Sequence, residues 1–192
     1  MARKNEFKPD RERSDVLGKL LLTQKQRRSL LRWTLLSVVC LVGLLVQDVA
    51  MHRLSIAGAC ADITPCLILM VVVMQGAESG CIFALVASCL YYFSGSAPGA
   101  FVIPLLTAVT ILVAIFRQGN LRQGFGAILL CAAGGMLLYE LGVFGVGWFL
   151  DLTISQRLPA LLLSAGMSMG IVPIAYPLLR AIGKIGGEIW NE

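Results

Sequence analysis

The sequence predicts an all-α protein that crosses a membrane several times. Hydrophobic residues make up 57% of the chain and charged residues only 14%, whereas soluble domains average about 45–50% and about 25%. The mean hydropathy is +0.81. Six apolar runs approach the roughly 20 residues that a helix needs to cross a bilayer core of about 30 Å. The length suits one domain, and the composition makes that domain a polytopic membrane domain.

The six predicted spans follow the order of the apolar runs. They cover residues 33–51, 63–76, 79–94, 99–116, 125–148 and 159–180. The breaks SGSAPG and RQGNLRQG are rich in turn-forming residues. Pro65 and Pro159 lie near predicted helix starts, where the missing N–H costs nothing. Pro104, Pro173 and Pro177 lie inside predicted spans, where we expect kinks or carbonyl groups that a neighbour must satisfy.

The connections between the second, third and fourth spans are short. The segment QGAESG joins the second span to the third, and SGSAPG joins the third to the fourth. Each connection is too short to let the two helices it joins separate, so they must run antiparallel and side by side. We therefore expect spans two to four to form a tight three-helix layer.

The basic residues are concentrated at the N-terminus. Residues 1–32 hold ten Lys or Arg against four acids, and residues 33–192 hold six against seven. With six spans and a cytoplasmic N-terminus, fourteen basic residues lie inside and only Arg53 and Arg157 outside, which agrees with the positive-inside rule. The sequence thus predicts a basic cytoplasmic tail over 1–32, a membrane domain over 33–182 and a short cytoplasmic C-terminus over 183–192.

The last part of the tail mixes leucines with basic residues. The segment 16–33 either lies on an anionic membrane surface or is a disordered tail that only sets the orientation of the protein. Binding to nucleic acid is not expected, because Phe7 is the only aromatic residue before Trp33 and offers no platform for stacking bases.

Small side chains recur at every fourth residue in two of the predicted spans. The residues of these strips are Gly76, Gly80, Ala84 and Ser88 in and before the third span, and Gly166 and Gly170 in the sixth. In lipid, apolar area alone does not drive helices together, and small residues let the helix backbones approach closely. Each strip serves either internal packing or the docking of another membrane protein.

Charged residues inside apolar runs are candidates for function, because each costs about 2.5–3.5 kcal/mol at the membrane centre. Only Glu140 lies well inside a run. It could pair with Arg53 or Arg157, or lie at the water boundary where the helix ends at the glycines that follow. A proton- or ligand-binding role and a contact with a partner are the other interpretations. Asp62, Glu140 and Arg157 are the residues of the predicted polar interface.

The sequence offers no recognisable catalytic or metal-binding motif. It has no Ser-His-Asp set, no H-E-x-x-H and no phosphate loop. His52 is the only histidine and cannot form a metal site alone, and no pair of the six cysteines has C-x-x-C spacing. The cysteines are expected to be buried free thiols, and a disulfide between Cys60 and Cys66 is the alternative. We expect neither enzymatic activity nor a cofactor, a metal or a small-molecule substrate.

Four successive segments over residues 62–118 carry a family resemblance. They are ITPCLILMVVVMQG, GAESG, YYFSGSAPG and LLTAVTILVAIFRQ. Together with six spans, a cytoplasmic N-terminus and the chain length, they resemble the MreD family of rod-shape-determining membrane proteins. Members of that family commonly carry an acid just before the Ser-Gly, where this chain has Tyr91 and Tyr92. The role of that acid is therefore not carried over.

The resemblance implies both a fold and a function. The implied fold is similar to the substrate-binding subunit of energy-coupling-factor vitamin transporters. The implied function is that of a non-enzymatic scaffold of the bacterial cell-elongation complex in the plasma membrane. Its main implied partner is MreC, and the MreB filament, RodA and a class B penicillin-binding protein are the others.

A solute-binding subunit of an energy-coupling-factor-type transporter is the alternative function, because the folds are alike. Such a subunit needs a cavity in its outer half, into which several polar side chains converge. The residues that the sequence offers for this purpose are Asp62, Tyr91, Tyr92, Tyr139 and Glu140.

Overall fold

The computed structural model describes residues 24–50, 59–120 and 124–185, of which 86% are helical and none forms a strand. The all-α prediction is confirmed for this part of the chain. The helices are α2 (Gln24–Ala50), α3 (Ile63–Gln75), α4 (Ala77–Phe93), α5 (Val102–Asn120), α6 (Phe125–Phe149), the 3-10 helix η2 (Ser155–Arg157), α7 (Leu158–Met169) and α8 (Val172–Ile185).

The described helices differ in length, and only some are long enough to cross a membrane. Both α2 and α6 meet the requirement, and α7 with α8 provides a third crossing if this pair, which is bent by 46°, counts as one span. The remaining apolar helices are shorter. The 13 residues of α3 extend only about 20 Å. Two to three spans follow from length and composition, and the six-span count stays a prediction.

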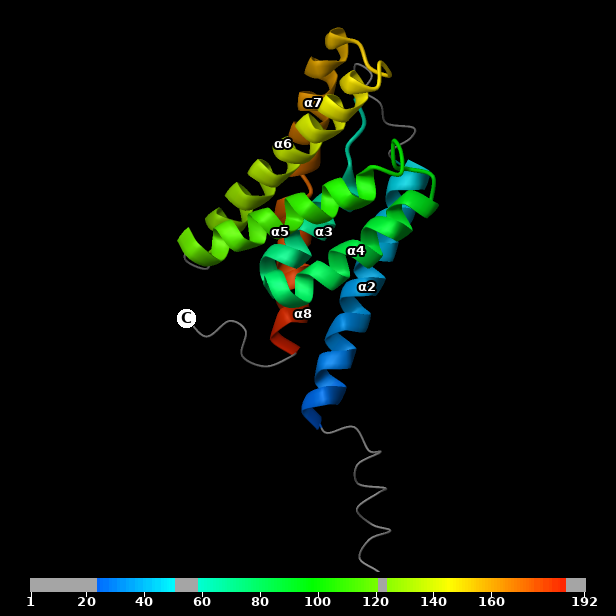
Figure 1. Cartoon of the computed structure of the whole chain (residues 1–192). Helices are drawn as coiled ribbons and strands as arrows, with labels where there is room; N and C mark the ends of the chain where they lie inside the picture. Colours follow the sequence, from blue (N-terminus) through cyan, green and yellow to red (C-terminus); the bar gives the residue numbers. More distant parts are fainter. Residues whose placement is uncertain (1–23, 51–58, 121–123, 186–192) are drawn as a thin grey trace, which may run out of the picture.

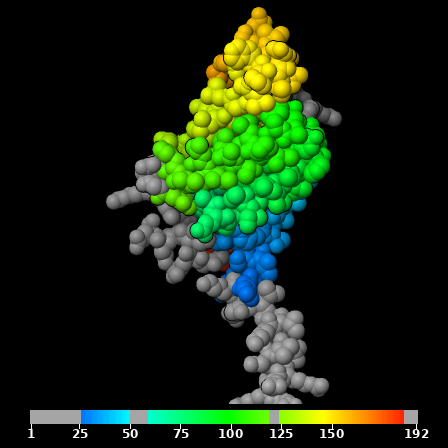
Figure 2. Space-filling model, in the orientation of Figure 1, coloured from blue at the N-terminus to red at the C-terminus, as the bar shows by residue number. Residues whose placement is uncertain are grey.

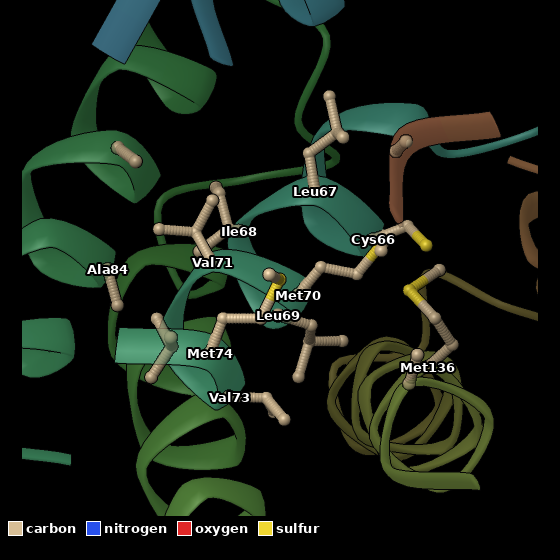
Figure 3. Close-up of a cluster of buried hydrophobic side chains, with 14 of the residues drawn as sticks. Cys66, Leu67, Ile68, Leu69, Met70, Val71, Val73, Met74, Ala84 and Met136 are labelled. Carbon is tan, nitrogen blue, oxygen red and sulfur yellow. The ribbon is translucent and has the colours of Figure 1, made fainter. Parts of the chain in front are cut away.

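Helix α3 lies at the centre of the molecule, in contact with α2, α4, α5, α6 and α8 (Figure 1). All of its residues except Gln75 are buried. The run ITPCLILMVVVM is apolar on every side, which is typical of a helix that other helices surround. Figure 3 shows its side chains directed outwards on several sides, with Ala84 of α4 on one side and Met136 of α6 on another. The core of the molecule is therefore built around α3.

A single residue, Gly76, joins α3 to α4. Its φ of 93° lies in the left-handed region that favours glycine. The connection is shorter than the six residues of QGAESG, because Ala77 already begins α4. At Gly80, an added Cβ would lie 3.1 Å from the Cα of Val72 in α3. The backbones of α3 and α4 are thus so close after the turn that a residue larger than glycine at position 80 would push them apart.

The predicted sixth span consists of two helices, α7 and α8, which meet at Gly170. Pro173 lies in the first turn of α8, so the break comes before it and the missing N–H interrupts no helical bond. Pro104 likewise lies in the first turn of α5 and interrupts nothing. Of the three prolines expected inside spans, only Pro177 lies inside a helix.

The first helix begins at Gln24, well before the predicted start of the first span at Trp33. Residues 24–32, which the sequence assigns to the tail, therefore continue into the same helix as the span. Arg32 is buried in this helix, and its guanidinium carbon lies 5.6 Å from the centroid of the Trp33 ring. The first 23 residues of the tail and the loop with His52 and Arg53 lie outside the described residues.

The outer surface of the helices is apolar. The ends of α6 and α7 project beyond the rest of the molecule (Figure 2). Around them Trp148, Phe149, Leu152 and Ile154 have exposed fractions between 64% and 88%. Apolar surface of this extent is typical of proteins that contact lipid or another protein.

Candidate functional site

A cavity of about 600 Å³ lies between the N-terminal end of α3 and the helices α4, α6 and α7. Its lining combines residues that are far apart in the sequence. Asp62 precedes α3, Tyr91 lies on α4, Tyr139 and Glu140 lie on α6, Arg157 ends η2 and Ser164 lies on α7. The fold thus brings together Asp62, Glu140 and Arg157, the three residues of the predicted polar interface.

Asp62 stands at the N-cap position of α3, but its carboxylate does not cap the helix. The Oε1 atom of Gln47 accepts the Thr64 N–H at 2.7 Å and so satisfies the first turn of α3. The Asp62 backbone N–H donates to the Ser168 Oγ at 2.8 Å, and Gln47 Nε2 donates to the Asp62 carboxylate at 3.4 Å. The carboxylate therefore remains available to the cavity. Burial raises the pKa of the Asp62 carboxyl above its ordinary value.

Glu140 is buried, with an exposed fraction of 2%. Helix α6 continues through the glycines that follow to Phe149, so the interpretation that the helix ends near Glu140 at the water boundary is wrong. The Ser164 Oγ lies 3.1 Å from the Glu140 Oε1. The carboxyl groups of Glu140 and Asp62 line the same cavity, close enough to influence each other's ionisation. Two neighbouring carboxyl groups resist simultaneous ionisation, so the pair favours a proton or another cation.

Tyr91 and Tyr139 bring two buried phenol rings to the cavity. The Tyr91 hydroxyl accepts from Gln47 Nε2 at 3.4 Å and donates to the Ser96 carbonyl oxygen at 3.5 Å. The Tyr139 hydroxyl is buried near the Tyr91 side chain but forms no hydrogen bond of ordinary geometry within the described part of the chain. An unsatisfied buried hydroxyl costs about 1–3 kcal/mol, so this group calls for an explanation.

Tyr92 does not belong to this site, although the sequence offered it with Tyr91. It is absent from the cavity lining, and its ring centroid lies 5.6 Å from that of Phe93. Consecutive residues on a helix point about 100° apart, and here Tyr91 is buried towards the cavity whereas Tyr92 is exposed on another face of α4. The structure therefore keeps four of the five residues that the sequence offered for a solute site.

Arg157 is the only basic residue of the described cavity lining, and it lies exposed at the rim. Within residues 59–120 and 124–185 no ion pair joins it to Glu140, and the alternative partner Arg53 lies outside the described residues. At the same rim, the Ser96 hydroxyl donates to the carboxylate of Asp48. The cavity is therefore acidic in its interior and carries its one basic group at the entrance.

The two strips of small residues lie in different environments. Gly80, Ala84 and Ser88 are buried on α4, which packs against α3. Gly166 and Gly170 are exposed on α7 and at its end, and an added Cβ at Gly166 would meet no atom within 4 Å. The first strip thus serves packing inside the molecule, whereas the second faces outwards.

Several uncharged polar residues of the site were not predicted from the sequence, where the charged residues stood out. Gln47 is an isolated amide in the apolar part of α2, and this isolation was the available signal. Ser164 and Ser168 flank Gly166 in the sequence, where they were not distinguished from the strip of small residues. Their hydroxyls lie on the inner side of α7, where Ser164 contacts Glu140 and the carbonyl of Cys60, and Ser168 accepts from Asp62.

No family model, no curated protein and no solved structure matches this chain.

The six cysteines are free thiols, so the pairing of Cys60 with Cys66 is wrong. No group of three or more His, Cys, Asp or Glu in the described residues could hold a metal ion. Chemically, the arrangement is suited to non-covalent binding of a molecule that donates hydrogen bonds or carries positive charge, because most of its interior groups are acceptors.

Proposed function

We propose that this protein is a multi-pass protein of a bacterial plasma membrane, with six crossings and both termini in the cytoplasm. The apolar outer surface of the helices supports this proposal. Ile82, Leu112, Leu130 and Ile174 come from four helices, and their exposed fractions range from 58% to 76%. Lipid would remove this surface from water. Helix α3 is short but buried on all sides, so its ends need not reach the lipid headgroups.

The arrangement of the connections is compatible with six crossings. The connections before α3, after α4 and after α6 all contribute residues to the same cavity, as expected if they lie on one side of the membrane. With the bent α7–α8 pair counted as one crossing, Arg180 and Lys184 fall on the side of the basic N-terminal tail. Such a distribution follows the positive-inside rule.

Within this membrane the protein serves as a scaffold of the cell-elongation complex, like the MreD family that it resembles. The segments that carry the resemblance form α3, α4 and α5, and these helices pack tightly against one another. The proposed main partner is MreC, with the MreB filament, RodA and a class B penicillin-binding protein as further partners. The outward strip of Gly166 and Gly170 offers a flat face for a partner helix.

Crosslinking in native membranes followed by mass spectrometry tests the scaffold. We expect crosslinks to wall-synthesis or cytoskeletal proteins and a change in cell width on depletion. Gly166→Leu should weaken the crosslinks, whereas Gly134→Leu, on an equally open face of α6, should leave them unchanged. The proposal fails if no such partner is enriched and depletion leaves the cell width unaltered.

The second candidate function is that of a solute-binding subunit of an energy-coupling-factor-type transporter. It is favoured by one specific observation, the convergence of Asp62, Tyr91, Tyr139 and Glu140 on a cavity of about 600 Å³. Native mass spectrometry of the protein purified from its own membrane tests it. A stoichiometric small molecule that survives purification supports this candidate, and an empty protein that gains no mass from a membrane extract argues against it.

A further inference from the structure

The interior of the cavity contains more hydrogen-bond acceptors than protons. The carboxyl groups of Asp62 and Glu140 both line it. Ser164 has two acceptors within reach, the Cys60 carbonyl oxygen at 2.6 Å and the Glu140 Oε1 at 3.1 Å. Its hydroxyl carries one proton and can donate to only one of them. A ligand that brings donors and positive charge would complete this arrangement.

The Tyr139 hydroxyl is a second, independent indication of a missing partner. Only 1% of Tyr139 is exposed, it lines the cavity, and its hydroxyl forms no hydrogen bond of ordinary geometry in the described part of the chain, although Tyr91 lies nearby. Nearby, Tyr91 already contacts Gln47 and the Ser96 carbonyl. A phenol oxygen can accept a hydrogen bond, and phenol rings attract organic cations to their faces. Both properties of Tyr139 suit a cationic donor.

The size and lining of the cavity favour an organic molecule over an inorganic ion. Its volume of about 600 Å³ lies within the range of about 300–1,000 Å³ that is usual for small-molecule sites. Apolar side chains, among them Val143, Ala160 and Leu161, form part of the wall. Only two carboxylates line it, whereas Ca²⁺ takes about 6–8 oxygen ligands. The occupant therefore has an apolar body as well as a charged group.

We propose that this cavity binds a small organic cation. Its ammonium group is held between the carboxyl groups of Asp62 and Glu140 and donates a hydrogen bond to the Tyr139 hydroxyl oxygen. The apolar body of the ligand lies against the wall formed by α6 and α7, and Arg157 at the rim faces its far end. This inference goes beyond the scaffold function. It also names the ligand class for the second candidate function, on whose cavity it rests.

Two matched pairs of probes test the charge requirement on the purified full-length chain in detergent. Each pair consists of an ammonium compound and the alcohol of similar shape, namely benzylammonium with benzyl alcohol, and butane-1,4-diammonium with butane-1,4-diol. We expect a saturable rise of the thermal unfolding midpoint with an ammonium member and none with its alcohol. If neither ammonium compound stabilises the protein more than its alcohol does, the site holds only a proton and the proposal is overturned.

Tyr139→Phe and Glu140→Gln test the residues. Tyr139→Phe removes an unpartnered hydroxyl, so it should leave the unfolding midpoint without probe unchanged or higher, while the probe binds at least threefold more weakly. Glu140→Gln should weaken binding of the probe at least tenfold. If Glu140→Gln does not fold, Asp62→Asn is measured in its place. The control is Glu78→Gln, which alters an exposed carboxylate in the first turn of α4. Equal affinity in all of these variants overturns the proposal.

The experiments separate this inference from the proposed functions. Probe binding is measured without any partner protein, so failure to crosslink MreC or another partner does not affect it. A stoichiometric anion or neutral molecule found by native mass spectrometry would support a solute-binding subunit and overturn the cationic ligand. An amine found there would support both.

Discussion

The two ends of α3 are completed in different ways. At its C-terminal end the buried guanidinium of Arg117, from α5, donates to the Val73 carbonyl, and Gly76 turns the chain directly into α4. At its N-terminal end Gln47 satisfies the Thr64 N–H, while the Asp62 carboxylate is left beside a cavity of about 600 Å³. One end is closed by packing and the other is left open.

The difference shows how polar groups can be used for structure or kept for a ligand. At the closed end, the charge of Arg117 is directed at a helix carbonyl, where a cation is favourable. At the open end, the acid in the N-cap position makes no cap, and the Tyr139 hydroxyl nearby has no partner in the described residues. A carboxylate that caps no helix and a buried hydroxyl without a hydrogen bond of ordinary geometry mark the end of α3 where we expect binding.

The largest expected effect on stability tests whether α4 packs tightly along α3, between the two ends that are compared. Ala84→Leu places a large side chain in the fully buried strip of α4 that packs against α3. We expect a loss of about 3 kcal/mol in the free energy of unfolding, or no folded protein, because overpacking forces the helices apart. Thermal unfolding in detergent measures it. Gly166→Leu, on an open face, is the control, and equal stability of the two variants would show that α4 does not enclose α3.

The next largest effect concerns the closed end. Arg117→Ala removes the donor to the Val73 carbonyl and leaves that buried acceptor unsatisfied. The expected loss is about 2 kcal/mol in the free energy of unfolding, in the range for hydrogen bonds to charged groups. The unfolding midpoint of Arg117→Ala is compared with that of Arg117→Lys, which keeps the charge and should lose less. If both variants match the parent, the guanidinium does not close this end.

Much of the fold could be predicted from the sequence, because the apolar runs are long and their breaks have turn chemistry. The second, third and fifth predicted spans agree with α3, α4 and α6 to within two residues at each end. The sixth corresponds to α7 and α8 together, and its bend at Gly170 was not predicted, because composition shows that a segment is apolar and not that it bends. The first failed at its start, because Arg32 and its basic neighbours indicated a tail although they continue the helix as Gln24–Ala50.

The site could be predicted only in part. Asp62 and Glu140 were found because a charge in an apolar region is rare and visible in the sequence. Gln47 was missed because its role depends on the amide of Thr64, which lies on a different helix. The unsatisfied state of Tyr139 was likewise invisible, because it depends on what surrounds its hydroxyl and not on the residue itself.

A smaller effect on stability tests how closely α2, the helix that carries Gln47, approaches the N-terminal end of α3. At Gly43, an added Cβ would lie 2.2 Å from Cδ1 of Leu67 in α3. Gly43→Ala should destabilise the protein by about 1 kcal/mol, at the low end for overpacking, because a leucine methyl can shift. Gly134→Ala, on an open helix face, should instead stabilise by up to about 1 kcal/mol. Thermal unfolding of both variants tests this, and effects of the same sign would show that α2 does not approach α3 closely.

The smallest effect separates the two polar side chains at the open end. Gln47→Ala removes the acceptor for the Thr64 N–H and should cost about 1 kcal/mol, as loss of a helix cap does. Asp62→Ala should change the free energy of unfolding by less than about 0.5 kcal/mol, because its carboxylate caps nothing and accepts only a long hydrogen bond of 3.4 Å from Gln47, and because burial raises its pKa and so disfavours the ionised form in the folded protein. The measurement is the difference between the two unfolding free energies at neutral pH without ligand. If Asp62→Ala destabilises the protein more than Gln47→Ala does, the carboxylate stabilises the fold and is not available to bind a cation. Both ends of α3 would then be closed by the fold itself.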